Sequence, residues 1–251
     1  MKPILFNTDM VRAILDGRKT VTRRVVKQGK STPKYHNRDK FYGVVDHLNN
    51  DYKNCYAGFY NDNDIFYGTN GERLIDAIYF KAPYKVNDVL YVRETWQSWS
   101  CAECDCECVP DNGNGCCTMP KYLYRASDDE TYKGWKPSIH MPKEAARLFL
   151  RVTDVRVEKL RDMKLEDFLK EGISINAEKL KTIHSVVSTP DEIEKAERLA
   201  YMEAANKFKD LWNSTAGKPF SPERYSNNWY GNPYVWVIEF EVIPADQAEG
   251  N

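Results

Sequence analysis

The sequence predicts an α+β fold that is mainly β, namely a small twisted β-barrel with flanking helices and loops inserted between its strands. Many short segments alternate between apolar and polar residues, as half-buried strands do, whereas few segments have helical spacing. The pattern begins with a strand-like segment, Ile4–Phe6, and closes with another, Tyr234–Ile243. The long segment Leu148–Glu158 changes phase near Thr153, which indicates the kind of bulge by which small barrels bend a strand.

The first elements lie close together near the N-terminus. Apolar residues at helical spacing predict a short helix over about 10–16, with a capping residue among 7–9. Gly17 suits the left-handed residue that ends such a helix. The β-branched residues of Thr20–Val26 then predict a strand.

The later elements follow in chain order as a strand Val89–Trp96, the long strand named above, a short helix Lys164–Lys170, a long helix Thr189–Trp212 and the closing strand. Segments without a place in this pattern, at about 28–80, 101–120 and 174–190, are interpreted as insertions. We therefore expect a single domain over residues 1–243 and a loose C-terminal tail over residues 244–251.

The composition bounds the class of protein. A chain of 251 residues that is 42% hydrophobic can bury a sizeable core. The net charge of −1 gives no general reason to expect nucleic acid, but residues 1–40 hold eleven Lys or Arg against three Asp, an excess of eight positive charges. This basic end either faces phosphates or is a solvated surface. Apolar runs of about 18 residues and a signal peptide are both lacking, so we expect a cytoplasmic protein without a membrane partner. No protein partner can be predicted.

A compact cationic corner, residues 17–24, follows the first predicted helix. Its cationic and hydroxyl-bearing candidates for binding or catalysis are Arg18, Lys19, Thr22, Arg23 and Arg24. Such a corner can bind an anion or a base, or it can use Lys19 as a base toward Thr22. Burial and neighbouring cations lower the pKa of a Lys from its ordinary value of about 10.4, which allows a neutral amine to activate a Thr hydroxyl.

The spacing of this pair sets a geometric condition. Residues three apart in a continuous strand point to opposite faces of a sheet. Lys19 can therefore meet Thr22 only if it lies in the turn after Gly17, before the strand becomes regular, and we predict that it does.

The strand Val89–Trp96 carries a carboxylate in unusual company. Glu94 and Trp96 share one strand face with Leu90 and Val92. Glu94 is predicted either to be buried and paired with an Arg or to lie at the rim of the core. Its role is either structural or, with Trp96, part of a binding site.

A proline-stiffened loop, 135–142, is a candidate wall for a base. Trp135 can stack on a base, while Ser138 and His140 can form hydrogen bonds with it. The alternative is a packed loop whose His is satisfied by the protein.

Six of the seven Cys residues lie within residues 101–117. An odd, clustered set without a signal peptide argues against disulfides, and four thiolates suit a structural Zn²⁺. The best ligand set is Cys101, Cys104, Cys116 and one of Cys106, Cys108 or Cys117, with Cys108 preferred. The alternative is a group of reduced thiols without metal. No cofactor for catalysis is expected.

Ordered motifs along the chain resemble one known family. The segment Gly17–Arg23 after its helix resembles the signature of the ASCH domain, a branch of the PUA-like β-barrels. Further blocks are similar to that family in the same order, namely Asp88–Trp96, Trp135–Pro142, Leu150–Thr153, Glu171–Ile173, Phe208–Trp212 and Val235–Phe240. The full set resembles the larger ASCH proteins of phages and prophages.

The resemblance implies a PUA-like barrel with a cleft for a nucleobase, a modified nucleoside or RNA. Small bacterial ASCH proteins hydrolyse the acyl amide of N4-acetylcytidine with a Lys, a Thr three residues later and a distant Glu. Lys19 and Thr22 match the first two, and the position after the short helix points to Glu171. The resemblance thus implies a hydrolase of an N-acylated cytidine. A non-catalytic RNA or modified-base binding module stays open, as does an RNase with Lys19 and Arg24 on the phosphate.

Overall fold

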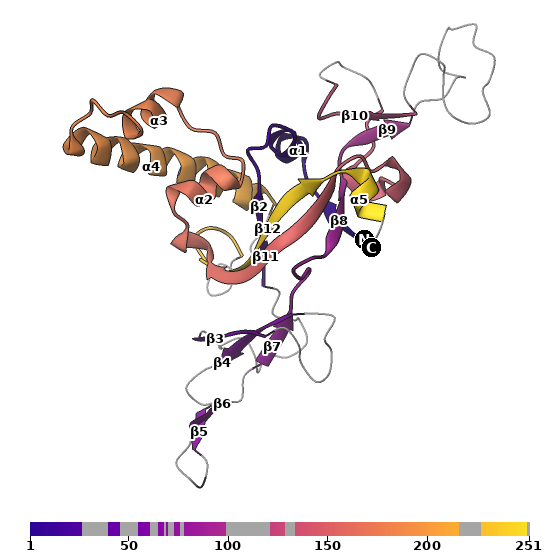
Figure 1. The fold of residues 1–251 in the computed structure, drawn as a ribbon. Helices are drawn as coiled ribbons and strands as arrows, with labels where there is room; N and C mark the ends of the chain where they lie inside the picture. Colours follow the sequence, from indigo (N-terminus) through magenta and orange to yellow (C-terminus); the bar gives the residue numbers. More distant parts are fainter. Residues whose placement is uncertain are drawn as a thin grey trace, which may run out of the picture. The chain divides into compact units, whose positions relative to one another are not determined.

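The structure is a computed structural model (Figure 1). It describes residues 1–26, 40–45, 55–60, 65–67, 69, 73–75, 78–98, 121–128, 134–215 and 227–249. Of the described part of the chain, 36% is helix and 32% is strand, and the described sheets are not closed into a barrel. The fold therefore mixes α and β structure as predicted, but strands do not predominate over helices in the way we expected.

The chain divides into two compact units. Unit 1 comprises residues 1–20, 88–151 and 240–251, and unit 2 comprises residues 21–87 and 152–239. Each unit is described by itself below.

Unit 1 begins with a strand and a short helix. Strand β1 (Lys2–Leu5) pairs in parallel with β8 (Val89–Arg93), with Ile4 opposite Val92. Helix α1 (Thr8–Leu15) begins where the Asn7 side chain accepts the Met10 N–H at 2.8 Å. Gly17 follows the helix with a φ of +70°, which is the left-handed conformation predicted for it.

The predicted strand Val89–Trp96 is interrupted near its end. Strand β8 stops at Arg93, and β9 (Trp96–Ser98) starts a separate antiparallel pair with β10 (Tyr122–Tyr124). The face predicted for Glu94 is nevertheless correct, because Leu90, Val92, Glu94 and Trp96 are all buried. Two single-turn helices, η4 (Ser138–His140) and η5 (Lys143–Ala145), follow.

The C-terminal residues of unit 1 differ from the loose tail that the sequence predicted. Residues Ala245–Glu249 form helix α5. Ala248 is fully buried and packs in one cluster with Val89, Phe149 and Ile243. Because the Ala side chain is small, Ala248 contributes little to a hydrophobic pattern, and the sequence therefore did not indicate this helix.

Unit 2 is built on an antiparallel pair of strands. Strand β2 (Val21–Val25) pairs with β12 (Tyr234–Ile243), and Thr22 lies opposite Ile238. The long strand β11 (Phe149–Lys159) and β12 each contain residues of both units. Hydrogen bonds give the strand order β1-β8-β11-β12-β2.

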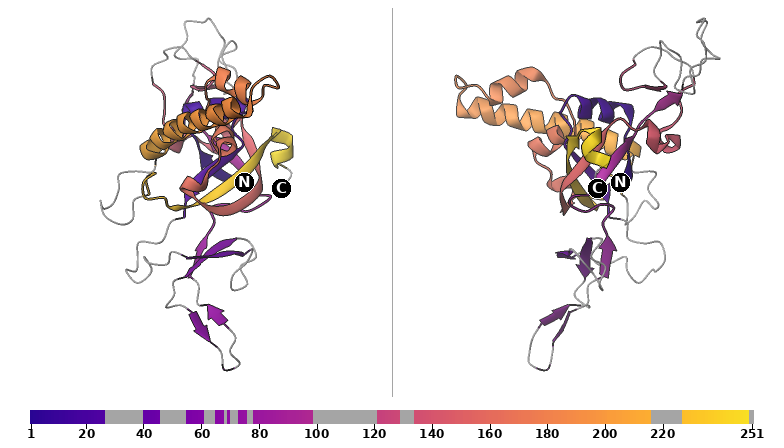
Figure 2. Two further views of the ribbon diagram at one scale, coloured as in Figure 1. Left: turned by 90° about the vertical axis from the view of Figure 1, so that its left-hand side faces the viewer. Right: turned by 45° about the vertical axis from the view of Figure 1, so that its right-hand side comes forward.

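Helical segments follow the long strand in unit 2. They are η6 (Leu160–Asp162), α2 (Leu165–Lys170), α3 (Ala177–Ile183) and α4 (Pro190–Thr215). Phe168 of α2 packs with Phe208 and Trp212 of α4 against Val235 and Val237 of β12. The predicted insertion 174–190 thus contains α3, which lies along α4 in both views of Figure 2.

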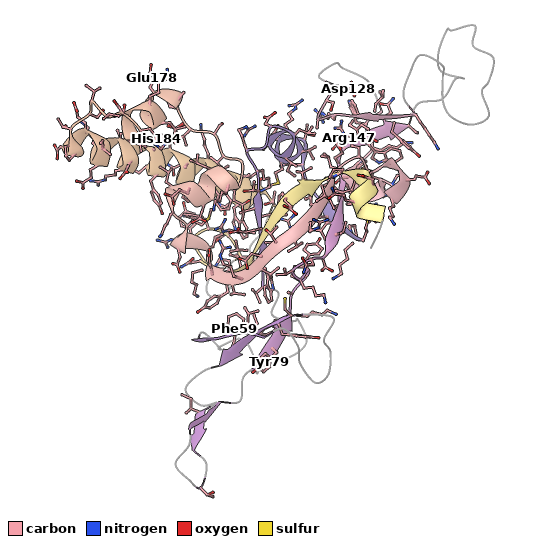
Figure 3. All side chains as sticks on the ribbon, viewed as in Figure 1. Phe59, Tyr79, Asp128, Arg147, Glu178 and His184 are labelled. Carbon is pink, nitrogen blue, oxygen red and sulfur yellow. The ribbon has the colours of Figure 1, made fainter. Side chains whose placement is uncertain are left out.

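The predicted insertion 28–80 contains short strands where it is described. Strands β3 (Lys40–Val45), β4 (Tyr56–Tyr60) and β7 (Ile78–Lys81) form an antiparallel sheet, and β5 (Ile65–Tyr67) pairs with β6 (Arg73–Ile75). Phe59 of β4 is labelled in Figure 3, and its ring lies 4.9 Å from the ring of Tyr234. No helix in the described ranges is long and apolar enough to cross a membrane.

Candidate functional site

Burial selects a small set of polar residues. Among the residues that the structure describes, the buried polar or charged ones are Lys19, Thr22, Arg23, Glu94 and Glu171. All five are among the site residues that the sequence predicted. Because a buried charge costs several kcal/mol unless it is paired, each of them must have a partner or a function.

Lys19 lies between the turn at residues 16–17 and strand β2, where it forms a β-bridge outside the regular strand. The N–H groups of Arg18 and Lys19 both donate to the Ala13 carbonyl, at 2.8 and 2.9 Å, and so continue the end of α1. Strand β2 begins only at Val21, so the geometric condition set by the sequence is met. The Lys19 side chain is 1% exposed, and its Nζ lies 5.6 Å from the centre of the Phe6 ring.

Thr22 and Arg24 share a face of β2 and contact each other. Arg24 Nη1 donates to Thr22 Oγ1 at 2.8 Å. Burial lowers the pKa of the Arg24 guanidinium below its ordinary value, and the nearby Glu171 and Tyr84 oppose that shift. A guanidinium at a hydroxyl oxygen stabilises negative charge that develops there, so Thr22 is well placed to lose its proton.

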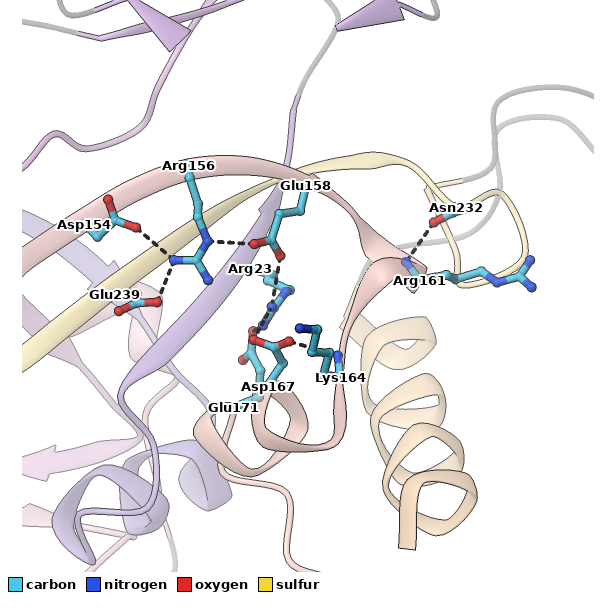
Figure 4. Close-up of polar contacts among 10 residues, drawn as sticks. All are labelled: Arg23, Asp154, Arg156, Glu158, Arg161, Lys164, Asp167, Glu171, Asn232 and Glu239. Carbon is cyan, nitrogen blue, oxygen red and sulfur yellow. Dashed lines mark hydrogen bonds and ion pairs between the residues drawn. The ribbon is translucent and has the colours of Figure 1, made fainter. Parts of the chain in front are cut away.

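Arg23 points to the other face of β2 and is surrounded by carboxylates (Figure 4). Its Nη1 lies 3.2 Å from Glu171 Oε1. Its Nη2 lies 3.3 Å from Glu158 Oε2 and 3.3 Å from Asp167 Oδ1. The Arg23 side chain is fully buried, and its Nε has no hydrogen-bond partner among the described residues.

Glu158 extends this cluster to a second guanidinium. Arg156 Nε donates to Glu158 Oε1 at 2.6 Å, and Arg156 Nη1 lies 2.8 Å from Asp154 and 2.5 Å from Glu239. Burial alone would lower the pKa of Arg156, but its hydrogen bonds to Glu158, Asp154 and Glu239 raise it above the ordinary value. Arg156 therefore stays a cation and fixes the strand side of the cluster.

Glu171 is positioned by the end of a helix. It caps α2, its N–H donates to the Asp167 carbonyl at 3.0 Å, and Gly172 follows with a φ of +89°. Asp167 and Glu171 lie one helical turn apart and both reach Arg23. Unit 2 thus joins the predicted residues as two pairs, Thr22 with Arg24 on one face of β2 and Arg23 with Glu171 on the other, and the influence of Glu171 on the pKa of Arg24 links the pairs.

Glu94 is a paired carboxylate of unit 1. Arg147 binds it in a bidentate manner, with Nε at 2.9 Å from Oε1 and Nη2 at 2.9 Å from Oε2. The guanidinium of Arg147, labelled in Figure 3, also lies 4.0 Å from the centre of the Tyr124 ring. These contacts agree with the first of the two readings that the sequence left open, an Arg-paired Glu94.

Trp96 packs inside unit 1. It is 7% exposed, its ring lies 5.8 Å from that of Tyr122, and Lys136 Nζ lies 4.9 Å from its ring centre. Its backbone pairs with Lys136, which ties the loop 135–142 to β9. The ring is therefore covered by the protein and does not offer an open stacking face.

The remaining predicted residues of unit 1 lie nearer the surface. Trp135 and Ser138 are half-buried, and His140 is exposed. Arg18 is also exposed, and it pairs with Asp16 at 2.7 Å. The His140 backbone N–H donates to the Pro137 carbonyl at 3.0 Å within η4.

The predicted zinc ligands Cys101, Cys104, Cys108 and Cys116 lie outside the described residues. Within the described ranges, no group of three or more His, Cys, Asp or Glu residues could hold a metal ion.

Sequence reasoning missed the partners of the buried arginine. Glu158 lies two residues after Arg156 and four after Asp154, so all three share a strand face. Asp167 and Glu171 share a helix face. These two patterns mark charged faces, but neither shows which cation the carboxylates bind. Tyr84, which raises the pKa of Arg24, follows a predicted insertion, and no sequence pattern marked it as part of the site.

Comparison with known proteins identified no relative of this chain. No family model, curated protein or solved structure matches this chain. Membership of the ASCH family therefore stays a prediction from the motifs.

Proposed function

We propose that this chain is an ASCH-type hydrolase that removes the acyl group from an N-acylated cytidine or a related modified nucleoside. The observation that carries the proposal is the burial of Lys19, Thr22 and Glu171, whose exposed fractions are 1%, 1% and 4%. Buried polar side chains of this kind concentrate at functional sites, because a fold gains little stability from them. The proposal includes a PUA-like arrangement of the strands around them.

The proposed reaction proceeds in two steps. Thr22 Oγ1 attacks the acyl carbonyl while the neutral amine of Lys19 accepts the hydroxyl proton. The amide C–N bond breaks, the proton passes from Lys19 to the departing N4 amine, and an ester on Thr22 remains. A water molecule then attacks the ester and gives a proton to Lys19. Lys19 passes this proton to Thr22 Oγ1 as the ester C–O bond breaks, which releases the carboxylic acid and restores Thr22 and the neutral amine.

Two other residues support these steps. Arg24, at 2.8 Å from Thr22 Oγ1, favours the loss of the Thr22 proton to Lys19 as the attack begins. Glu171 accepts a hydrogen bond from the exocyclic N4–H group and so places the acyl carbonyl against Thr22. The chain thus supplies the nucleophile, the base and the orientation from its own side chains.

A binding module for a modified base is the second candidate. The hydrogen bond from Arg24 to Thr22 favours it too, because the same contact satisfies a hydroxyl that only lines a site. An RNase with Lys19 and Arg24 on the phosphate is the third candidate.

Product analysis separates these functions. The full chain is incubated with N4-acetylcytidine, RNA or DNA, and the products are identified by mass spectrometry. We expect cytidine and acetate from N4-acetylcytidine. Binding without turnover would support the module instead, and shortened RNA would support the RNase.

Substitution of the nucleophile gives the first prediction. Thr22→Val, which removes the hydroxyl, should lower turnover by at least about 100-fold, whereas Thr22→Ser should keep much of it. Thr20→Val is the matched control, because Thr20 is an exposed neighbour. Turnover by Thr22→Val at the wild-type rate would exclude Thr22 as nucleophile.

A further inference from the structure

We infer that Arg23 is a positioning residue that holds the Glu171 carboxylate in the orientation in which it meets the ligand. The inference rests on the proposed function, in which Glu171 contacts the substrate. It assigns a role to a side chain that lies between Thr22 and Arg24 in sequence but points to the other face of β2.

The contacts of Arg23 divide unequally among the three carboxylates. Among the described carboxylates, Nη1 contacts Glu171 alone, at 3.2 Å. Nη2 contacts both Glu158 and Asp167, each at 3.3 Å. Glu158 belongs to β11 and Asp167 to α2. The shared nitrogen therefore fixes the guanidinium plane between a strand and a helix, and the fixed plane directs the other nitrogen at Glu171.

A Lys at position 23 cannot reproduce the fixed contacts that the Arg23 guanidinium makes with the carboxylates. The guanidinium is a planar fork whose donors have fixed directions, while the Lys ammonium is a point charge on a flexible stem. Replacing Arg23 by Lys keeps the charge of the cluster and removes the fixed direction. This substitution separates electrostatic balance from positioning.

The ion pairs are not needed to attach α2 to the protein. Phe168 of α2 is fully buried, and its ring packs 5.5 Å from Phe208 and 6.3 Å from Trp229. Apolar packing of this kind docks a helix without charges, and buried ion pairs are often replaceable by apolar residues without loss of stability. What Arg23 adds to the docked helix is a defined direction for the carboxylate at its end.

Arg156 provides a matched control. Both guanidinium groups contact Glu158, Arg156 at 2.6 Å and Arg23 at 3.3 Å. Among the described carboxylates, the ion-pair partners of Arg156 are Asp154, Glu158 and Glu239, and Glu171 is not one of them. Arg156→Lys therefore disturbs the same carboxylate network on its strand side and leaves the contact of interest in place.

The kinetic test is a double-mutant cycle in the full chain with N4-acetylcytidine. Arg23→Lys should lower kcat about 10- to 100-fold with little change in KM, because a displacement of about 1 Å in a positioned group costs that much. In the Glu171→Gln background, Arg23→Lys should have no further effect, because it acts only through Glu171. Losses that multiply, or an equal loss in Arg156→Lys, would overturn the inference.

A second readout does not need turnover. The carboxyl carbon resonance of Glu171, assigned from its disappearance in Glu171→Gln, should shift in Arg23→Lys and stay unchanged in Arg156→Lys. An unshifted resonance in Arg23→Lys overturns the inference whatever the kinetics. If the wild type binds but does not hydrolyse N4-acetylcytidine, the proposed function fails alone, and this resonance decides the role of Arg23.

A charge-compensated variant covers the case in which Arg23→Lys does not fold. Arg23→Gln combined with Asp167→Asn removes the cation and one of its carboxylates together. It should shift the Glu171 resonance as Arg23→Lys does, and an unshifted resonance again contradicts the inference.

Discussion

For buried charged residues, the sequence indicated which side chains are buried but did not identify their partners. An acidic side chain on an apolar strand face stands out in a sequence, and Glu94 is indeed buried beside Leu90 and Val92. The kind of partner, an Arg, could be predicted as well. Its identity could not, because Arg147 lies 53 residues away in the chain and only the strand pairing brings it close.

The Glu94–Arg147 pair gives a prediction about stability. Arg147→Met leaves a buried carboxylate without its partner and should lower the free energy of unfolding by about 3 kcal/mol, near the lower end for such pairs because Arg147 is 27% exposed. Adding Glu94→Gln should restore part of the loss. Chemical denaturation measures both.

A surface pair of the same unit serves as the control. Arg151 and Glu241 lie 3.3 Å apart with side chains that are 32% and 53% exposed, so Arg151→Met should cost at most about 1 kcal/mol. Equal losses in Arg147→Met and Arg151→Met would contradict a buried structural role for Glu94.

At the scale of elements, local signals set most boundaries. Helix α1, its Gly17 turn and strand β2 were predicted within two residues, and β12 was predicted over the same residues that form it. Because this turn precedes β2, Lys19 lies before the first residue of the regular strand. Capping and left-handed turns are properties of adjacent residues, so a sequence displays them directly.

Faces of strands were harder to predict than their extents. Strict alternation places Val242 on the same face as Trp236 and Ile238, yet Val242 is 51% exposed, whereas Ile243 is buried. Residues 235–238 of β12 are all buried, so alternation fails to mark a single inner face there. A strand covered on both faces carries no period from which the face of its last residues can be predicted.

The contact between α3 and α4 yields a prediction for pH dependence. Hydrogen bonds from Lys179, at 2.5 Å, and Lys207, at 2.9 Å, lower the pKa of Glu203 from 4.5 to about 2. Because the folded value lies below the unfolded one, the ionised carboxylate favours the folded state above about pH 4.5, and this contribution is lost as pH falls through about 2.

Denaturation midpoints at several pH values test this sign. Glu203→Gln should be less stable than the wild type at pH 7, and the difference should shrink as the pH falls below about 4.5. Glu197→Gln is the control, because Glu197 is an exposed residue of the same helix. A difference that grows toward low pH would contradict the assignment.

At the scale of the whole molecule, the sequence predicted the classes of element better than their assembly. It predicted a barrel, whereas the described sheets are not closed. Strand partners such as β1 with β8 and β2 with β12 join segments far apart in sequence. Periodicity within a strand carries no information about such partners, and closure of a sheet depends on all of them together.

The central claim is that Lys19 acts chemically on a bound nucleoside. Binding of N4-acetylcytidine by calorimetry and release of cytidine by mass spectrometry can be measured on one preparation of Lys19→Met, which keeps the length of this 1%-exposed side chain. Arg18→Met is the control, because Arg18 is exposed and pairs with Asp16. We predict that Lys19→Met binds within a few-fold of the wild type and loses turnover by at least about 100-fold. Turnover by Lys19→Met at the wild-type rate would contradict the account.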